Sequence, residues 1–328
     1  MLESAAALLY AGRQWVWGHS VSNQGPTASE GAIQPIGFLV ALAPDWRVSR
    51  VSANIAEHLG VPAADLLGKP VTSLFTHEAV HSLRNRLALL RSPDSVERLF
   101  NIALTGSESL FDVALHMSGN SVVIEAEPSR DHHHDRDSTG TVRGMIAQLG
   151  LIETLPAFFT EAARQMRALT GFDRIVIQRL CEGGSTEPAG EAVRSGARST
   201  VGRPSSAGEL TSSSNDHRTI LTLIADTDAD PVALVAPANA RQGGLDLSNA
   251  MLLASPPAQV AALREAGIGA AIRLPLIVAG GKWGEIICYH HAPCCPSFER
   301  RSAIEWFALM LAMQIEIREL RARLETAR

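Results

Sequence analysis

The four cysteines are the side chains whose chemistry stands out in this sequence. Cys294 and Cys295 are neighbours in a short segment between two prolines, just before a predicted helix that carries Arg300 and Arg301. A helix N-terminus and nearby cations favour the thiolate, which is the reactive form of cysteine. Neighbouring Cα atoms lie about 3.8 Å apart, whereas ordinary disulfides need roughly 4.4–6.8 Å, so a bond within the pair would be strained and easily reduced. The pattern leaves two interpretations open: a redox-active pair, or two ordinary thiols in a surface turn.

The other two cysteines are weaker redox candidates. Cys288 lies in an apolar predicted strand and is typical of a small buried core residue. Cys181 follows another predicted strand and is expected at its exposed end. The four cysteines lack the spacing of a zinc site. Three adjacent histidines, His132 to His134, lie in a charged segment that we interpret as a solvated linker, so no metal site is predicted.

Composition argues against several classes of function. The 328 residues are 46% hydrophobic with a formal net charge of −5, and only 5% are aromatic, so neither the charge nor the stacking needed for nucleic-acid binding is evident. No apolar run approaches the roughly 18 residues of a membrane span. A phosphate-binding glycine loop in a useful context and a Ser–His–acid arrangement are both missing. We therefore expect a cytoplasmic protein with no nucleic-acid or membrane partner and no enzymatic activity within this chain.

The first predicted domain spans residues 31–128 and should contain an antiparallel sheet. A buried strand is predicted at residues 37–42, and a second strand around Trp46 and Val48. A short helix should end at Gly60. Two alternating segments, FDVALHM and SVVIEAE, flank Gly119-Asn120, which is a strong hairpin signal. Strands, short helices and a hairpin predict an α+β domain with helices on one side.

The second predicted domain spans residues 144–328. An N-terminal segment at 1–30 precedes the first domain, and a linker at 129–143 joins the two domains. Its strand DRIVIQRL is followed by residues 181–216, which we expect to be the least structured part of the chain. A second hairpin is predicted where AIRLPLIV and KWGEIICYHH flank Gly280-Gly281. A helix should end at Gly171, with an apolar stripe of Leu155, Phe159, Ala162, Met166 and Leu169.

The predicted final helix, capped by Ser297, carries two apolar stripes. The stripe expected to face its own domain is Ile304, Phe307, Ala308, Leu311 and Ile315. The other stripe has heptad spacing and consists of Trp306, Met310, Met313, Ile317, Leu320 and Leu324. One domain cannot readily cover both stripes, so we predict a homodimer through this helix, the alternative being a thick core helix with a frayed end. Because no Gly or Pro stops the helix, we expect the natural chain to continue.

Several motifs carry a resemblance to a known family. GAIQPIG and VSRVSANIAEHLGVPAADLLGKPV resemble the PAS domain of bacteriophytochromes. GFDRIVIQRL, LDLSNAML, REAGIGAAIRLPLIVAGGKWGEIICYHH and the closing helix resemble their GAF domain. The resemblance implies an α+β PAS–GAF pair in which the N-terminal segment threads a lasso around Leu245 to Pro257. It also implies a phytochrome-specific domain, a histidine kinase and a response regulator that acts after the kinase.

The family senses red and far-red light through biliverdin, and this chain departs from the chromophore-binding pattern. The anchoring cysteine of the family falls on Ser22, and the family's Asp-Ile-Pro motif has no counterpart in GRPSSAGELTSSSNDHR. Family histidines fall on Ile36, Gln259 and Tyr289, while His290 keeps its family identity. Arg194, Arg198 and Arg203 could attract a propionate but are typical of a solvated loop. We therefore expect this divergent member to bind no cofactor, with biliverdin absent.

Three functions follow as hypotheses. The first is a redox-responsive module that regulates a histidine kinase through its cysteine thiols after losing biliverdin and light sensing. The second is a photoreceptor that holds a bilin noncovalently. The third is a dimerisation scaffold that senses nothing.

Overall fold

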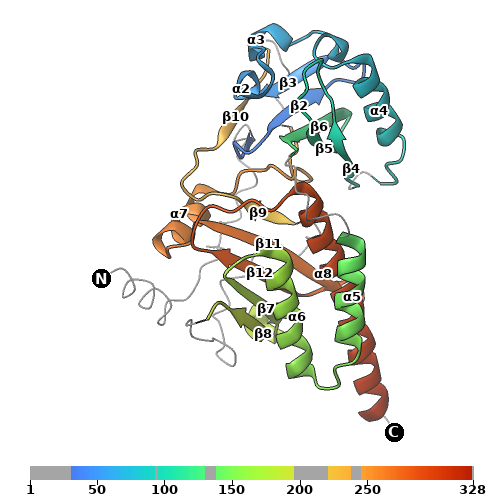
Figure 1. The fold of residues 1–328 in the computed structure, drawn as a ribbon, viewed down its shortest axis with the longest axis vertical. Coiled ribbons are helices and arrows are strands. Elements are labelled where there is room, and N and C mark those ends of the chain that lie inside the picture. The colour runs from blue at the N-terminus through green and yellow to red at the C-terminus, as the bar shows by residue number, and fades with distance from the viewer. Residues whose placement is uncertain (1–30, 93–94, 130–137, 196–220, 238–244, 327–328) are drawn as a thin grey trace. The chain divides into compact units, whose positions relative to one another are not determined.

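The structure is a computed structural model that describes residues 31–92, 95–129, 138–195, 221–237 and 245–326. These residues form two compact units (Figure 1). The N-terminal unit contains the described residues up to 129 together with 229–255, and the C-terminal unit contains the described residues of 138–228 and 256–326. Residues 229–237 and 245–255 thus belong with the N-terminal unit, although they lie far along the chain from the rest of it.

The N-terminal unit is built on a seven-stranded antiparallel sheet in the order β1-β10-β3-β2-β6-β5-β4. Its strands are β1 (Ala32–Ile33), β2 (Phe38–Leu42), β3 (Val48–Ser52), β4 (Glu97–Ile102), β5 (Phe111–Ser118), β6 (Ser121–Pro128) and β10 (Val232–Val235). Its helices are α2 (Ile55–Leu59), α3 (Ala63–Leu66), η1 (Val71–Ser73) and α4 (His77–Leu87).

Most of the elements predicted for this unit are confirmed. The predicted hairpin forms between β5 and β6 with Gly119-Asn120 as its turn, and Gly119 has the positive φ of 55° that such turns require. Helix α2 ends at Gly60, which adopts a left-handed conformation. The second predicted strand is confirmed as β3, but it begins only at Val48, because Trp46 lies in a turn with a φ of 62°. The Trp46 N–H donates to the carbonyl of Ala43, which reverses the chain before the strand starts.

Both faces of this sheet are buried, which explains why every residue of β2 is apolar. One face packs against the helices, and it includes Phe111, Val113 and Leu115 of the predicted hairpin. The other face is covered by the segment 245–252, whose Leu247 and Leu252 pack in the same cluster as strand residues. The backbones also approach closely at Gly37, where a Cβ atom would lie 2.4 Å from the carbonyl oxygen of Ala126. A side chain at Gly37 would therefore collide with β6.

A buried carboxylate holds the segment 245–252 to the sheet. Glu125 on β6 accepts hydrogen bonds from the backbone N–H groups of Met251 at 3.0 Å and Leu252 at 2.7 Å. The His116 ring lies beside it, with Nδ1 3.5 Å from Glu125 Oε1, and the two side chains are 0% and 2% exposed. Burial lowers the pKa of His116 to about 4, although the carboxylate of Asp246 acts in the opposite direction. Residues 245–252 thus pack on the sheet of the N-terminal unit. The lasso and the threading of the N-terminal segment through it stay predictions, because residues 1–30 lie outside the described part.

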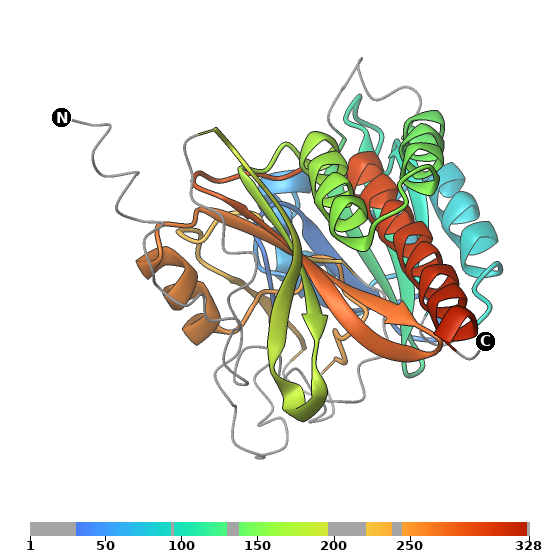
Figure 2. The same ribbon diagram turned by 90° about the horizontal axis from the view of Figure 1, so that it is seen from below.

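The C-terminal unit is built on a five-stranded antiparallel sheet in the order β8-β7-β12-β11-β9. Its strands are β7 (Arg174–Leu180), β8 (Thr186–Val193), β9 (Thr222–Ile224), β11 (Ala270–Val278) and β12 (Gly281–His290). Its helices are α5 (Ser138–Gly150), α6 (Leu155–Thr170), η2 (Glu182–Gly184), α7 (Pro257–Glu265) and α8 (Phe298–Thr326). Helices α5, α6 and α8 lie side by side against one face of the sheet (Figure 2).

Three predictions for this unit need correction. Strand β8 lies inside the segment expected to be unstructured, and it pairs along its length with β7. Helix α5 begins at Ser138, inside the predicted linker. The hairpin turn is Ala279-Gly280 rather than Gly280-Gly281, because Gly281 pairs with Val278 and both turn residues have positive φ. Propensity and pattern place such boundaries only approximately, since strand pairing decides the register.

The predicted helix stripes are largely confirmed. Helix α6 ends at Gly171, and its stripe is buried except for Leu155, which is exposed. The Ser297 hydroxyl accepts the N–H of Arg300 at 3.1 Å, so Ser297 is the N-cap of α8 as predicted. All five residues of the inner α8 stripe are buried. Five of the six residues of the heptad stripe are exposed, namely Trp306, Met313, Ile317, Leu320 and Leu324.

Within the described residues, no helix combines the length and the apolar character that a membrane crossing needs.

Candidate functional site

The face of the C-terminal sheet opposite the three long helices carries an apolar cluster beneath α7. Ile287 and Tyr289 alternate along β12 and share this cluster with Ala271, which pairs with Tyr289 on β11. Strand β9 contributes Ile224, and Leu263 of α7 packs over the strands. We call this set of residues, which also includes Ile268, the α7 cluster. It is a buried apolar surface at the strand ends.

Two buried ion pairs lie on the same face of the sheet as the α7 cluster. Arg174 Nη2 lies 2.7 Å from Glu191 Oε1, and the two side chains are 3% and 2% exposed. Arg273 on β11 pairs with Glu285 on β12, whose side chain is fully buried. The strand registers place each pair on the face of Ile287, because Arg273 lies opposite Ile287 and side chains alternate along a strand. Within the described residues, Glu285 Oε1 has no hydrogen-bond partner.

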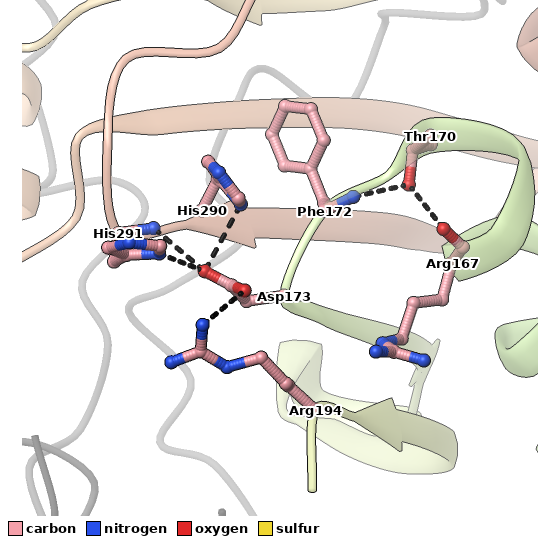
Figure 3. Close-up of polar contacts among 7 residues, drawn as sticks. All are labelled: Arg167, Thr170, Phe172, Asp173, Arg194, His290 and His291. Carbon is pink, nitrogen blue, oxygen red and sulfur yellow. Dashed lines mark hydrogen bonds and ion pairs between the residues drawn. The ribbon is translucent and has the colours of Figure 1, made fainter.

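A polar cluster lies where β7 begins and β12 ends (Figure 3). Asp173 Oδ2 accepts hydrogen bonds from the backbone N–H and the ring Nδ1 of His291, and it lies 3.1 Å from Nδ1 of His290. Arg194 approaches the other oxygen, with Nη1 3.6 Å from Asp173 Oδ1. Because β7 and β12 are paired neighbours, the sheet itself brings Asp173 to the two histidines.

The charges in this polar cluster shift the pKa values of its members. Burial raises the pKa of Asp173, but hydrogen bonds from His291 and the nearby imidazoles outweigh it, so the pKa is lowered from its ordinary value. Burial lowers the pKa of His290, helped by His291 and Arg194 and opposed by Asp173. At neutral pH the cluster therefore contains an ionised carboxylate beside a neutral His290 ring.

The structure separates the residues that the sequence grouped as a degenerate chromophore site. Tyr289 belongs to the α7 cluster, and Gln259 lies half-buried on α7. His290 follows Tyr289 on the strand but joins the polar cluster instead. Ile36 packs in the N-terminal unit against the cluster that contains Leu252. Ser22 lies outside the described residues.

The cysteines occupy unequal environments, and within the described residues none of the four forms a disulfide. Cys288 is fully buried, and burial raises its pKa far above the ordinary value, which suits a core residue. The pKa of Cys181 is raised by desolvation and by the Glu187 carboxylate. Cys294 and Cys295 are half-buried in the segment before α8, where the Cys294 N–H donates to the carbonyl of Ala225.

Sequence reasoning missed the residues that give this unit its polar character. The motif GFDRIVIQRL contains Asp173 and Arg174, but no role was predicted for either residue, for His291 or for the two buried ion pairs. A charged residue at the start of an apolar strand was the available signal, since a buried charge needs a partner. It assigned Arg194 to a solvated loop, whereas Arg194 follows β8 and pairs with Asp173.

Comparisons with known proteins place these units in recognised families. The PAS fold matches residues 23–129, and the GAF domain matches residues 154–318, which is half of the chain. The phytochrome-like protein Cph1 of Synechocystis is 25% identical over 88% of this chain and 39% of its own. A bacteriophytochrome of Pseudomonas aeruginosa is 26% identical over 89% of this chain and 40% of its own. The chain thus spans about two fifths of the length of these curated relatives.

Solved structures agree over nearly the whole chain. The chromophore-binding domain of an unusual bacteriophytochrome, RpBphP3 from R. palustris, is 29% identical with a TM-score of 0.78, covering 89% of this chain and 96% of that one. The chromophore-binding domain of Stigmatella aurantiaca phytochrome P1 is 25% identical with a TM-score of 0.77, covering 86% of this chain and 95% of that one. These matches confirm the predicted α+β pair of PAS and GAF domains, each with an antiparallel sheet and helices.

The same comparisons contradict one prediction, namely that the chain has no cofactor. The relatives are phytochromes, and the solved neighbours are described as chromophore-binding domains, which points to a bilin cofactor rather than none. The departures at Ser22 and at the Asp-Ile-Pro motif therefore do not establish a loss of the chromophore. The chain belongs to the GAF domain family, and with its PAS fold it is a bacteriophytochrome-like PAS–GAF sensory module.

Proposed function

We propose that this chain is the light-sensing input module of a phytochrome-type receptor and that it holds a bilin without a covalent bond. The observation that carries the proposal is the match over 89% of the chain to a chromophore-binding domain at 29% identity. The sequence resemblance predicts that Ser22 takes the position of the family's anchoring cysteine, and a serine hydroxyl without an adjacent base is a weak nucleophile near neutral pH. The structural match supports a bound bilin, and the serine at position 22 supports binding without a covalent bond.

The α7 cluster and the ion pairs beside it fit a bilin. A tetrapyrrole has a large apolar ring system, and the buried side chains of Ile287 and Tyr289 give this face of the sheet an apolar lining. The buried Glu285 Oε1 is an acceptor that a pyrrole N–H could satisfy, since an unpaired buried acceptor is costly. Arg174 and Arg273 lie on this face, each paired with a carboxylate, and a propionate would compete with those carboxylates for the guanidinium groups. The bilin would supply the absorption of visible light.

Added biliverdin should give the purified protein a red absorption band that disappears when the protein is denatured. No zinc-fluorescent band should remain on the denatured wild-type chain, because no thioether joins the two. Ser22→Cys should restore a thiol at the family position and produce a fluorescent band. Ser29→Cys is the matched control, since it adds a thiol to the same segment at a position where the family has no anchor. A wild-type protein without bilin-dependent absorbance would overturn the proposal.

We also propose that α8 joins two copies of the chain. The heptad stripe leaves Met313, Leu320 and other large apolar side chains exposed along one side of the helix, which is typical of a two-helix seam. A second copy would cover it, because the same stripe on both helices is self-complementary.

Leu320→Glu should convert a dimer into a monomer in sedimentation experiments, because a charge at the seam remains buried without a partner. Arg321→Glu on the same exposed turn is the control and should leave the dimer intact. A wild-type chain that sediments as a monomer at every concentration would contradict the seam.

Three further expectations concern the signalling pathway. The family relationship supports a histidine kinase output, a response regulator as its partner and a cytoplasmic location. Redox sensing by Cys294 and Cys295 stays a prediction. Their position just before α8 would let a change in the thiols affect the proposed dimer helix. Titrating kinase output of the longer protein with dithiothreitol would test it.

A further inference from the structure

The polar cluster at the start of β7 brings three potential metal ligands to one point. Asp173 offers a carboxylate oxygen, and His290 and His291 each turn Nδ1 toward it (Figure 3). The ligand atoms all lie within 4.8 Å of one another. Adjacent histidines converge here because His290 ends β12 and His291 begins the bend that follows, so the backbone turns between them.

The donor set and its spacing suit a transition-metal ion. Two imidazole nitrogens and a carboxylate oxygen are the ligands that Zn²⁺ and its neighbours accept, with three protein ligands and an open fourth position. Two ligands about 2.1 Å from one tetrahedral ion lie about 3.4 Å apart, so ligand atoms that lie up to 4.8 Å apart must move closer together when the ion binds. The His291 side chain is 55% exposed, which leaves it room to rotate and gives the ion and its water a path from solvent.

The surroundings of Asp173 favour binding in a second way. Its carboxylate is held in place by the backbone N–H of His291, so its orientation is set before an ion arrives. Each ring must present the Nδ1 lone pair to the ion, so a proton on Nδ1 moves to Nε2 or to water when the metal binds.

We propose that Asp173, His290 and His291 form a binding site for a divalent transition-metal ion of the zinc class. The site lies outside the α7 cluster, and it does not depend on the proposed bilin. The ion joins the residue that precedes β7 to the last residue of β12 and to the first residue of the chain that leads into α8. Metal binding would therefore stabilise the connection between the sheet and the final helix.

Arg194 provides a test that distinguishes a metal site from a purely structural hydrogen-bond cluster. Its guanidinium approaches the Asp173 carboxylate and competes with an incoming cation. The Arg194 side chain is more than half exposed, so solvent weakens its attraction to Asp173 and its competition with the cation is modest. Arg194→Gln should tighten Zn²⁺ binding about two- to five-fold, which matches a surface pair worth up to about 1 kcal/mol.

The experiment titrates Zn²⁺ alone into the protein without added bilin, by calorimetry. Because His132 to His134 form a second potential metal-binding segment, the background variant replaces all three with glutamine. We expect one Zn²⁺ per chain, and we expect His291→Ala and Asp173→Asn each to weaken binding by at least about ten-fold. His77→Ala, which removes an exposed histidine of the N-terminal unit, is the control and should change nothing.

Co²⁺ then identifies the donor atoms by absorption spectroscopy. We expect bands of nitrogen and oxygen ligands without sulfur-to-metal charge transfer. Charge-transfer bands would assign the ion to the cysteines and overturn the proposal. No Zn²⁺ binding in the background variant, or binding that His291→Ala leaves unchanged, would overturn it as well. Since His291 is exposed, His291→Ala remains informative even where Asp173→Asn fails to fold.

Discussion

Replacing Glu191 by glutamine should lower the free energy of unfolding of the C-terminal unit by about 3 kcal/mol. Glu191 and Arg174 are almost completely buried, and their charged atoms are 2.7 Å apart. Glutamine keeps the size of the side chain and removes its charge, so the Arg174 guanidinium loses the negative charge of Glu191 in a place with little access to water. Urea unfolding, followed by circular dichroism, measures the change.

A double replacement tests whether the cost comes from the unpaired charge. Arg174→Met with Glu191→Leu removes both charges, and it should recover most of the stability that Glu191→Gln loses, because apolar pairs often replace buried ion pairs at little cost. Arg323→Gln breaks the exposed pair with Glu319 and should change stability by less than about 1 kcal/mol. A double variant no more stable than Glu191→Gln would show that packing, and not charge, dominates.

Acidification should destabilise the N-terminal unit through His116. Its folded-state pKa is about 4 because the ring is buried, whereas the unfolded chain has the ordinary pKa of 6.5. As the pH falls below 6.5, the unfolded state binds the proton first, so stability is lost progressively until pH 4 is reached. The difference of about 2.5 pKa units at 1.36 kcal/mol each amounts to about 3 kcal/mol. Chemical unfolding at pH 7, 6, 5 and 4 measures the slope.

The carboxylates around His116 oppose the lowering of its pKa, and burial of the ring outweighs them. Glu125 lies 3.5 Å away, but its two oxygens already accept the N–H groups of Met251 and Leu252. Asp246 opposes the shift without reversing it. His116→Leu should flatten the pH dependence between 6.5 and 4, whereas His81→Leu, at an exposed position on α4, should leave it unchanged. Equal slopes in wild type and His116→Leu would contradict the assignment to His116.

Local sequence signals predicted the elements whose cause is local. The β5–β6 turn forms at Gly119-Asn120 because a two-residue loop needs positive φ, and α8 begins after Ser297 because its hydroxyl caps the first turn. The predictions failed where a distant partner decides the conformation. Strand β8 forms in a segment rich in Gly and Glu because β7 offers it a full set of backbone partners.

The candidate site divides in the same way. Motifs such as GFDRIVIQRL and KWGEIICYHH were sufficient to predict the family and the strands on which its residues lie. They were insufficient to predict that Tyr289 packs in the α7 cluster whereas His290 contacts Asp173. Side chains alternate across a strand, and only the packing shows what covers each face.

The sequence by itself determined the order of the two domains, the inner stripe of α8 and the absence of a thiol at Ser22, since each depends on residue types and their spacing. The tertiary structure decided which distant residues meet: Glu125 with the 245–252 segment, Arg174 with Glu191, and Asp173 with His290 and His291. The physical reason is that a charge in an apolar strand only specifies that a partner is needed, while strand pairing determines which residue that partner is.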